Sequence, residues 1–519
     1  MNAQNPGSAR PDKLSLSVLV PVYNEQYLVS SSLWRLSVLR ECEFLNRIEI
    51  IVVDDGSDDE TRRVLDGFAQ SLAGENSVWS AKMNWIFRRH PANRGKGEAI
   101  RTALELATGD ISVVHDADLE YNPRDLMRML RVFIEEDADA VYGSRFAGGE
   151  VRRALLFRHQ LGNKLLTFVC NLVSNLNLTD IETCYKAVRT DLLKSIPITS
   201  KRFDLEPEIT IKLAKRGARV FEIPISYSGR TYREGKKIGW RDGLIALWAI
   251  AKFGISDNIY TQDEYGSRVL ARLARAPRFN AWMADAILPF VGQRVLEIGS
   301  GTGNLTRRLA PRSEYVASDV NPLYLQTLAN LKEERPYLST AFCDVSELSS
   351  FPLSAQGYDT VICLNVIEHV ADDRAALRNI KSVLAERGRA IVLVPQGPSN
   401  MGTLDTVLGH RRRYTCGSLT QLAADCGMRV ANLVEFNRVG TIAWFWNGKI
   451  LKRRAFGALQ IWALNLLTPV LRKVDRLLPV PPLSLIAVLE PEINARPQVV
   501  PLRADSTEAV EVPARSQVR

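Results

Sequence analysis

Two aspartates, Asp116 and Asp118, follow the apolar run ISVV within residues 111–121 and are separated by a single alanine. If this run is a strand that continues through them, its alternation directs both side chains toward one face. Two carboxylates that face one site repel each other unless a cation joins them. A hard divalent ion, Mg²⁺ or Mn²⁺, would join them and also bridge to diphosphate oxygens. The pair therefore predicts a metal site for a nucleoside diphosphate; the alternative is two solvated acids in a turn.

A different chemistry is indicated by VLEIGSGTGN at residues 295–304, where three glycines alternate after an apolar run. A glycine turn between a strand and a helix lets a cofactor approach the backbone closely. Asp319 ends the next apolar run and is placed to accept hydrogen bonds from ribose hydroxyls, and Asp344 after a third run suits an adenine amino group. The alternatives are a tight turn without a ligand, a helix cap at Asp319, and a dinucleotide site.

The elements that position the aspartate pair are predicted to be two strands and the helix between them. Apolar runs at residues 14–23 and 48–57 flank a helical segment at 26–42. This pattern is typical of a parallel sheet, in which function is expected at the carboxyl ends of the strands. Asp54 lies at such an end, and we expect it to contact the base or ribose of a nucleotide. We expect the next helix to begin at Ser57, because acidic residues suited to a first turn follow it.

Residues 14–253 resemble the inverting GT-A glycosyltransferases of family 2, and within that family they are most similar to polyprenyl- and dolichyl-phosphate sugar synthases. The matching stretches are VPVYNE, VVDDGSDDET, VVHDADLEY, NRGKGEAIRTAL, YGSRF, DIETCYKAVR, RFDLEPEIT and ISYSGRTYREGKKIGWRDG. The resemblance implies a nucleotide-sugar donor, and the form NRGKGEA favours a UDP-sugar over GDP-mannose. It implies Mg²⁺ or Mn²⁺ on Asp116 and Asp118, and a nucleotide-sugar site formed by Pro21, Tyr23, Glu25, Asp54, Asp55, Lys96, Asp116 and Arg145.

The chemistry of the acceptor separates two hypotheses. A sugar hydroxyl needs a general base, because its proton must leave as it attacks. A phosphate monoester is mostly dianionic near neutral pH, since its second pKa is about 6, and it needs cations and no base. We expect a polyprenyl phosphate acceptor, and for a glycan hydroxyl acceptor the candidate bases are Asp180 and Glu182. The candidate cations for the phosphate are Arg145, Arg202, Arg230, Lys236 and Lys237.

Residues 268–491 resemble the class I S-adenosylmethionine-dependent methyltransferases, because their glycine turn has the form E-x-G-x-G-x-G. The runs at 358–370 and 388–395 match strands four and five, and a dinucleotide enzyme would not be expected to carry the LNVIEHV form of strand four. We expect the seventh strand, at 483–490, to return as an antiparallel edge. The resemblance implies an S-adenosylmethionine site formed by Glu297, Gly299, Gly301, Gly303, Asn304, Asp319, Asp344 and Asn365.

Two histidines are candidates for a catalytic role in the second half. Histidine has an ordinary pKa near 6.5, which suits a proton acceptor. His369 follows the fourth strand, where the resemblance puts the methyl group, and His410 lies in LGHRRRYT, which looks like a substrate loop. The alternative is a structural histidine at a strand end. Arg411–Arg413 would meet an acidic or phosphorylated substrate, or form a solvated basic loop.

Composition bounds the possible settings of the chain. A chain of 519 residues is too long to fold around a single hydrophobic core, so we expect two domains. The net charge is +9. The seven cysteines lack the spacing of metal ligands, which indicates reduced thiols. The N-terminus has no apolar signal segment, and no run is a convincing membrane span, so we expect a cytoplasmic protein. Three segments leave peripheral contact with the cytoplasmic face of a membrane open: a basic apolar segment at 151–177, an apolar segment with few charges at 243–255, and tryptophans beside basic residues in 438–482. The alternatives are helices packed on the sheet for the first two segments and a helical lid over the methyl-acceptor site for the third. No nucleic-acid-binding module is recognisable, so we expect no nucleic acid partner.

The predicted organisation is α/β with two domains, a GT-A nucleotide-sugar fold followed by a Rossmann-like seven-stranded methyltransferase fold. We expect a bifunctional enzyme, with an independent methyltransferase or a membrane-recruited scaffold with one inactive domain as alternatives. The predicted boundaries are 1–13 for a disordered N-terminus, 14–255 for the glycosyltransferase domain, 256–267 for a linker, 268–492 for the methyltransferase domain with a helical insertion at 438–482, and 493–519 for a disordered tail.

Overall fold

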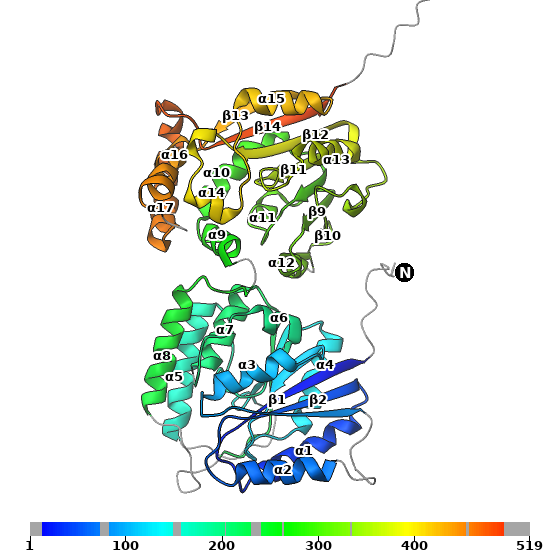
Figure 1. The fold of residues 1–519 in the computed structure, drawn as a ribbon, viewed down its shortest axis with the longest axis vertical. Helices are drawn as coiled ribbons and strands as arrows, with labels where there is room; N and C mark the ends of the chain where they lie inside the picture. Colours follow the sequence, from blue (N-terminus) through cyan, green and yellow to red (C-terminus); the bar gives the residue numbers. More distant parts are fainter. Residues whose placement is uncertain are drawn as a thin grey trace, which may run out of the picture.

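The computed structural model contains two seven-stranded sheets, each flanked by helices (Figure 1). One sheet is built from the first half of the chain and the other from the second half, which confirms the predicted pair of α/β domains. The structure describes residues 13–72, 82–148, 157–202, 204–229, 240–261, 264–332, 335–452 and 456–492.

The first sheet has the strand order β3-β2-β1-β4-β6-β5-β7, and β6 runs antiparallel to both of its neighbours. Its central strands read as continuous apolar runs because helices cover both faces. The bounds are β1 Leu14–Val22, β2 Leu45–Asp54, β3 Met83–Arg89, β4 Ile111–Val114, β5 Ala140–Ser144, β6 Lys186–Arg189 and β7 Val220–Pro224.

Helix α2 begins at Thr61, four residues after the predicted start at Ser57. The intervening residues form a loop in which the Asp59 carboxylate accepts a hydrogen bond from the Thr61 amide at 2.9 Å. The prediction of the start was wrong because these polar side chains bond to the loop and to the segment after β1. The helices are α1 Val29–Arg35, η1 Leu36–Glu41, α2 Thr61–Leu72, α3 Lys96–Leu106, α4 Arg124–Glu135, α5 Phe157–Ser174, α6 Thr190–Ser195, α7 Leu205–Lys215 and α8 Trp240–Ile255.

The second sheet has the order β10-β9-β8-β11-β12-β14-β13. The last strand is antiparallel as predicted, but it inserts between β12 and β13, so β13 forms the edge. Its middle residues are buried on both faces, which explains why they are apolar without alternation. The bounds are β8 Arg294–Ile298, β9 Glu314–Asp319, β10 Leu338–Phe342, β11 Tyr358–Leu364, β12 Leu384–Pro395, β13 Met428–Phe436 and β14 Ser484–Pro491.

The segment before the second sheet forms two helices, α9 and α10. Proline disfavours helical backbone in the residue before it, and Pro277 therefore ends the first helix and begins the second. The helices are α9 Glu264–Ala274, α10 Pro277–Ile287, η3 Leu288–Phe290, α11 Thr306–Leu309, α12 Pro322–Lys332, η4 Leu348–Ser350, α13 Asp373–Val383, η5 Pro398–Asn400, α14 Thr403–Leu408, α15 Cys416–Asp425, α16 Arg438–Phe445, η6 Trp446–Ile450, α17 Ala458–Val474 and η7 Asp475–Leu477.

The segment between the two sheets packs against both halves of the chain. The Tyr260 ring lies edge-on to Tyr324 of α12, at 5.5 Å between centroids. On its other side the Arg216 guanidinium stacks 3.9 Å from the Tyr260 ring. Nearby, the Asn330 side-chain amide donates to the Gly217 carbonyl at 3.0 Å. A small cluster of side chains thus joins the two domains.

Candidate functional sites

The carboxyl ends of β1, β2 and β4 meet at one edge of the first sheet. Val22 pairs with Asp54 across β1 and β2, and Leu19 pairs with Val114 across β1 and β4, all in parallel register. The segments that follow these strands therefore start from the same edge. The predicted nucleotide-sugar residues Pro21 and Asp54 lie at the ends of β1 and β2. The segments that follow contain the predicted nucleotide-sugar residues Tyr23, Glu25, Asp55 and Asp116 and the predicted metal ligand Asp118.

The aspartate pair lies beyond the end of its strand. Strand β4 stops at Val114, so strand alternation does not extend through Asp116 and Asp118 as the prediction assumed. Their exposure nevertheless alternates, since both aspartates are half-buried and Ala117 between them is buried. The Asp118 carboxylate accepts a hydrogen bond from the Glu120 amide at 3.1 Å. The two acids remain accessible on the open side of this segment.

Lys96, the first residue of α3, brings a positive charge to this edge. Its Nζ lies 2.9 Å from Asp116 Oδ1 and 3.4 Å from Glu206 Oε1. Burial opposes the charge on Lys96, but Asp116 and Glu206 outweigh it and hold the pKa of the ammonium well above its usual range. Burial alone would raise the pKa of Asp116, but the positive charge of Lys96 outweighs burial and holds this pKa below its usual value. At this edge the positive charge of Lys96 is therefore compensated by the carboxylates of Asp116 and Glu206.

Asp54 and Asp55 both use their carboxylates inside the protein. Asp54 is 1% exposed, accepts from the Ser57 amide at 3.0 Å, and forms an ion pair with Arg89 at 2.8 Å. Asp55 accepts from the Gly95 amide at 2.7 Å and lies 2.7 Å from Nδ1 of His90. These contacts fix the loops after β2 and β3. A direct contact of either carboxylate with a nucleotide stays a prediction.

Arg145 and Asp180 form a buried ion pair instead of facing an open site. Arg145 is 6% exposed and Asp180 is 0% exposed, and the guanidinium approaches the carboxylate through two nitrogens at 2.7 and 2.8 Å. The Arg145 amide and the Glu182 amide also donate to this carboxylate. The structure thus shows Arg145 and Asp180 paired with each other, and a contact of Arg145 with phosphate and a role of Asp180 as a base stay predictions. Burying a charge requires such a partner, which occupies both groups.

Glu182, the second candidate base, lies in a buried and acidic environment. Burial, together with the nearby Glu206 charge, raises its pKa to about 8. Among the described residues, no hydrogen-bond partner reaches the buried Glu182 Oε1 or Glu206 Oε2. Sequence reasoning assigned no role to Glu206, although it lies in the quoted stretch RFDLEPEIT. Glu206 is one of three acids at the start of α7, with Asp204 and Glu208, so nothing in the sequence singled it out.

The remaining predicted residues of the first domain belong to the nucleotide-sugar site and to the acceptor site. Tyr23 is 39% exposed, Glu25 is half-buried, and both follow β1 at the same edge as the aspartates. Arg202 is exposed, and its amide donates to Asp204. The other predicted acceptor cations, Arg230, Lys236 and Lys237, lie outside the described residues.

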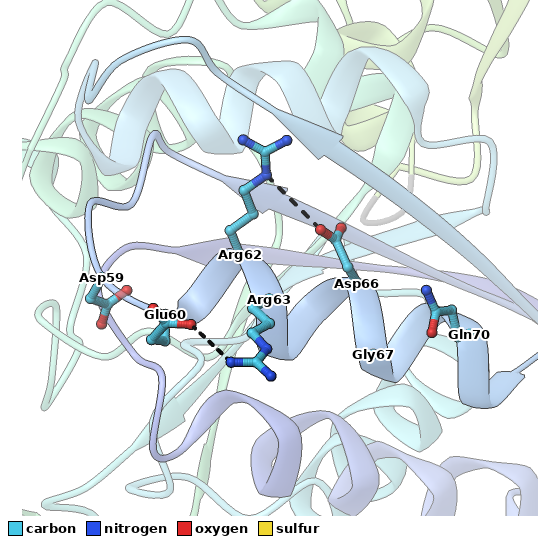
Figure 2. A pocket seen from close by; sticks show the side chains of 7 residues that line it. All are labelled: Asp59, Glu60, Arg62, Arg63, Asp66, Gly67 and Gln70. Atoms are coloured by element: carbon cyan, nitrogen blue, oxygen red, sulfur yellow. Dashed lines mark ion pairs between the residues drawn. The ribbon is translucent and has the colours of Figure 1, made fainter.

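A surface hollow of about 520 Å³ lies along α2 (Figure 2), and its lining residue Asp66 shares Arg89 with Asp54. Figure 2 shows its exposed ion pairs, Arg62 with Asp66 at 4.0 Å and Arg63 with Glu60 at 3.9 Å. Exposed pairs of this kind contribute little energy and are screened by salt. The hollow is a solvated, charged helix face and does not compete with the strand ends as a site.

In the second domain, the glycine turn after β8 has the backbone conformation that its sequence predicts. Gly299, Gly301 and Gly303 have φ angles of +73°, +55° and +78°, which side chains rarely adopt. A Cβ at Gly299 would lie 2.4 Å from Val366 Cγ2, and one at Gly303 would lie 2.7 Å from Leu331 Cδ1. The turn itself therefore requires glycine at these positions.

Acidic residues brace this turn from two sides. Asp319, at the end of β9, accepts from the Gly301 amide at 2.9 Å and from the Asn321 amide at 2.8 Å. Glu297 is buried and accepts from the hydroxyls of Thr306 at 2.6 Å and Tyr315 at 2.9 Å. Burial raises the pKa of Glu297. Both acids thus hold the turn in shape, whatever else they bind.

The other residues predicted for S-adenosylmethionine surround the same edge. Parallel register pairs Phe342 with Asp319, so half-buried Asp344 follows β10 beside the glycine turn. The Asn304 amide donates to the Leu270 carbonyl at 3.1 Å. Asn365 directly follows β11, has a φ of +55° and is exposed. Residues with such strained backbone are enriched at functional sites.

The two candidate histidines are brought together, and with them Glu368, which sequence reasoning missed. The rings of His369 and His410 are 4.9 Å apart. One ligand-type atom from each of Glu368, His369 and His410 lies within 4.8 Å of the others. Glu368 is 0% exposed, and burial raises its pKa to about 8. The stretch LNVIEHV contained the signal, an acid enclosed by apolar residues beside a histidine.

Asp405 organises the loop that carries His410. Its carboxylate lies 2.8 Å from His410 Nδ1, 2.8 Å from Arg413 Nε and 3.1 Å from Trp444 Nε1. Burial would raise the pKa of Asp405, but its hydrogen bonds and the Arg413 charge lower it to about 2. Trp444 is therefore not the interfacial anchor that its composition suggested, because its indole binds this carboxylate.

The three arginines after His410 contact the protein itself. Arg411 donates to the His369 carbonyl at 2.9 Å, Arg412 pairs with Asp373 at 2.8 Å, and Arg413 is buried against Asp405. Arg413 is therefore not part of a solvated loop, whereas Arg411 is exposed and its contact with a substrate stays a prediction. They fix the loop 408–415 onto the turn after β11.

Comparison with protein families assigns each half of the chain separately. Residues 17–196 match the model of glycosyl transferase family 2, and residues 296–390 match a methyltransferase domain. The chain therefore combines a family 2 glycosyltransferase domain with a methyltransferase domain, and both are transferase domains. This agrees with the resemblance of the two sequence halves to family 2 glycosyltransferases and to methyltransferases.

Several relatives match the first half of the chain. One is the UDP-N-acetylglucosamine–dolichyl-phosphate N-acetylglucosaminyltransferase of Methanococcus voltae, 28% identical over 41% of this chain and 85% of that protein. Another is the polyprenol monophosphomannose synthase of Mycolicibacterium smegmatis, 26% identical over 49% of this chain and 91% of that protein.

Solved structures also match each half. Glucosyl-3-phosphoglycerate synthase from Mycobacterium tuberculosis is 16% identical, with a TM-score of 0.36 over 48% of this chain and 84% of that one. A putative sarcosine dimethylglycine methyltransferase from Galdieria sulphuraria is 14% identical, with a TM-score of 0.30 over 41% of this chain and 86% of that one.

Proposed function

We propose that the first domain transfers a sugar from a nucleotide-sugar, a UDP-sugar in preference, to a polyprenyl phosphate, and that the second methylates a sugar or lipid-linked substrate with S-adenosylmethionine. The observation that carries the proposal is the common strand edge of the first sheet, where Asp116 and Asp118 lie beside Lys96. The names of the two relatives support a polyprenyl- or dolichyl-phosphate acceptor.

The residues at this edge fit a divalent cation. Two half-buried aspartates are separated by a single residue. Glu206 shares Lys96 with Asp116, and among the described residues its buried Oε2 has no hydrogen-bond partner. Mg²⁺ or Mn²⁺ held by Asp116 and Asp118 would neutralise the diphosphate and stabilise it as it leaves. Lys96, already 2.9 Å from Asp116, would shift between that carboxylate and a donor phosphate.

The state of the carboxylates supports a phosphate acceptor. A hydroxyl acceptor needs an ionised base, but Asp180 is fully engaged by Arg145, and Glu182 has a pKa of about 8. Near pH 7 Glu182 is mostly protonated and cannot take a proton. A dianionic phosphate attacks without losing a proton, so it does not need either acid. This chemistry favours the lipid phosphate over a glycan hydroxyl.

The second domain fits S-adenosylmethionine at the edge formed by β8, β9 and β10. Register places Ile298 opposite Ser318, so the glycine turn and Asp319 emerge side by side. Asp344 follows the neighbouring strand at the same edge. S-adenosylmethionine would supply the electrophilic methyl group there. The protein would hold the ribose and adenine through Asp319 and Asp344, with the glycine amides against the cofactor.

Apolar helix faces support peripheral contact with a membrane. In Figure 1, α5 and α8 of the first domain and α16 and α17 of the second lie along the left-hand edge of the view. Within the described ranges, no helix is long and apolar enough to cross a membrane. Large exposed apolar patches mark interaction surfaces, and lipid is the occupant that fits a polyprenyl substrate. The exposed side chains are Phe157, Leu161, Leu165, Phe168, Leu172, Leu244, Trp248, Ile255, Phe445, Trp446, Leu459, Trp462, Val470 and Leu477.

The proposal is tested with the full chain, a panel of UDP- and GDP-sugars, a short polyprenyl phosphate and Mg²⁺ or Mn²⁺. A lipid-linked sugar phosphate, detected by mass, is the expected product, and adding S-adenosylmethionine should then shift its mass by one methyl group. The Asp118→Asn variant serves as the matched control. Transfer only to a polyprenol or glycan hydroxyl would refute the phosphate acceptor, and a product without a mass shift would refute a shared pathway.

A further inference from the structure

Three metal-ligand side chains converge in the second domain, next to the proposed methyl-donor site. They are Glu368 and His369, in the turn after β11, and His410, in the loop after α14. Their ligand-type atoms lie within 4.8 Å of one another. Tetrahedral coordination at bonds of about 2.0–2.2 Å separates ligand atoms by about 3.3 Å, so small side-chain movements would close the set on an ion.

The burial of Glu368 without hydrogen-bond partners is not explained if the three side chains have only a structural role. The Glu368 side chain is 0% exposed, and neither carboxylate oxygen has a hydrogen-bond partner among the described residues. A buried polar group without a partner is destabilising, and native proteins rarely keep one without a ligand, ion or water. Because two imidazoles stand beside this carboxylate, a cation is the ligand that its surroundings favour.

The two loops that carry these side chains are joined by backbone contacts. The Arg411 amide donates to the Glu368 carbonyl at 2.9 Å, and the Arg411 side chain donates to the His369 carbonyl at 2.9 Å. Gly409, with a φ of +77°, turns the chain so that His410 follows directly. The ligand set is therefore held by the fold and does not depend on a chance approach of two surface loops.

A second layer orients His410. Its Nδ1 lies 2.8 Å from Asp405 Oδ1, which leaves Nε2 as the nitrogen for a ligand. Asp405 is in turn held by the Arg413 guanidinium and the Trp444 indole. Histidines that bind metals commonly donate the other ring nitrogen to a carboxylate in this way, which fixes the tautomer and the ring orientation.

We propose that Glu368, His369 and His410 bind a divalent transition-metal ion. One carboxylate and two imidazoles are a donor set suited to Zn²⁺ or Mn²⁺, and three protein ligands leave a coordination position open for substrate. This position lies next to the proposed methyl donor, because the turn with these ligands packs on the glycine turn. Val366 would lie 2.4 Å from a Cβ at Gly299.

The role of this ion rests on the proposed methyl transfer. An acceptor hydroxyl bound at the open position would have its pKa lowered, and its proton would pass to solvent water. The oxygen then forms a bond to the methyl carbon while the carbon–sulfur bond breaks, and the electron pair stays on sulfur. The products are a methyl ether, S-adenosylhomocysteine and one proton. The acceptor class is therefore a hydroxyl of a sugar or lipid-linked sugar.

Metal binding is tested first, on the full chain with the Asp116→Asn and Asp118→Asn substitutions to remove ions from the other domain. The metal-free protein is titrated with Co²⁺ and its visible absorption is recorded, and the Zn²⁺ stoichiometry is measured by elemental analysis. We expect one ion per chain and a spectrum with nitrogen ligands. Glu368→Gln and His410→Gln should each abolish the spectrum, while Glu386→Gln, an exposed matched control, should retain it.

The Asp405→Asn variant keeps all three ligands, so it guards against simple misfolding. It should weaken metal affinity by about 10–100-fold without removing the site. Unchanged Co²⁺ binding in correctly folded Glu368→Gln and His410→Gln variants, or no ion in the parent, would overturn the metal site. Methylation that survives removal of the ion would overturn only its catalytic role. An intact metal site in a protein that neither binds nor uses S-adenosylmethionine would instead refute the proposed methyltransferase activity.

Discussion

Replacing Asp180 with asparagine should destabilise the first domain, because this carboxylate is the partner of a buried arginine. Asp180 accepts hydrogen bonds from Arg145 Nε, from the Arg145 terminal nitrogen and from two backbone amides. Asparagine keeps one acceptor oxygen and removes the charge. The Arg145 guanidinium, 6% exposed, would then be buried without a counterion.

The expected magnitude follows from the burial of both partners. Breaking a buried ion pair by removing one partner costs about 3–5 kcal/mol, whereas exposed pairs contribute about 0–1 kcal/mol. A domain of this size has a total stability of about 5–15 kcal/mol. Asp180→Asn should therefore consume a large part of that stability, and a loss of transfer activity in this variant would reflect unfolding.

Hydrogen exchange of the full chain measures this effect where it should occur. Peptides from β5 and β6, which lie on either side of the pair, should exchange faster in Asp180→Asn, while peptides from the second sheet stay unchanged. Urea unfolding gives the size of the loss, with the two domains treated as separate transitions. The double replacement Arg145→Met with Asp180→Leu should recover much of the stability, because no charge is left unpaired.

One result would refute this reasoning. If Asp180→Asn exchanges and unfolds like the parent protein but no longer transfers sugar, Asp180 acts as a base and the acceptor is a hydroxyl. If the double replacement Arg145→Met with Asp180→Leu folds correctly and still transfers sugar, Asp180 cannot be the base.

Four further outcomes are expected. Asp118→Asn should lose metal-dependent transfer at any Mg²⁺ concentration, whereas the exposed Asp66→Asn should not; full activity of Asp118→Asn in EDTA would contradict the metal role. The stability of the first domain should fall as pH rises from about 4.5 to about 8, because unfolded Glu182 releases its proton first, and Glu182→Gln should flatten this slope in urea titrations. Gly301→Val, which forces a branched side chain to a φ of +55°, should abolish S-adenosylmethionine binding in calorimetry while far-UV circular dichroism stays unchanged; tight NAD binding instead would identify a different cofactor. Trp462→Glu should reduce co-sedimentation with anionic vesicles several-fold, and equal sedimentation would remove α17 from the membrane surface.

The sequence predicted the order of the elements well because strand ends and glycine turns are local signals. The apolar runs before Asp116 and before Gly299 each became a buried strand that ends where its polar residues begin. Errors arose where the signal is not local. The position of β14 inside its sheet depends on pairing with β12 and β13, and no residue within the strand itself records which neighbours it has.

The roles of charged residues were harder to predict than their positions. Asp54 was predicted to contact a nucleotide and Asp180 to act as a base, and in the structure each is buried against an arginine at least 35 residues away in sequence. A charge at a strand end is compatible with ligand binding and with holding a loop. The choice between them depends on which opposite charge the fold brings near, and pattern reading along the chain cannot supply that information.

Glu206 and Glu368 show what separates the two cases. Both are buried acids, and a buried charge needs compensation. In the structure, Glu206 is compensated by Lys96 from an element 110 residues away, and this contact makes it part of a balanced network. Glu368 has two histidines beside it and no hydrogen-bond donor among the described residues. An acid that the fold leaves uncompensated requires something from outside the chain, and for that reason Glu368 points to a metal ion, whereas Glu206 alone does not.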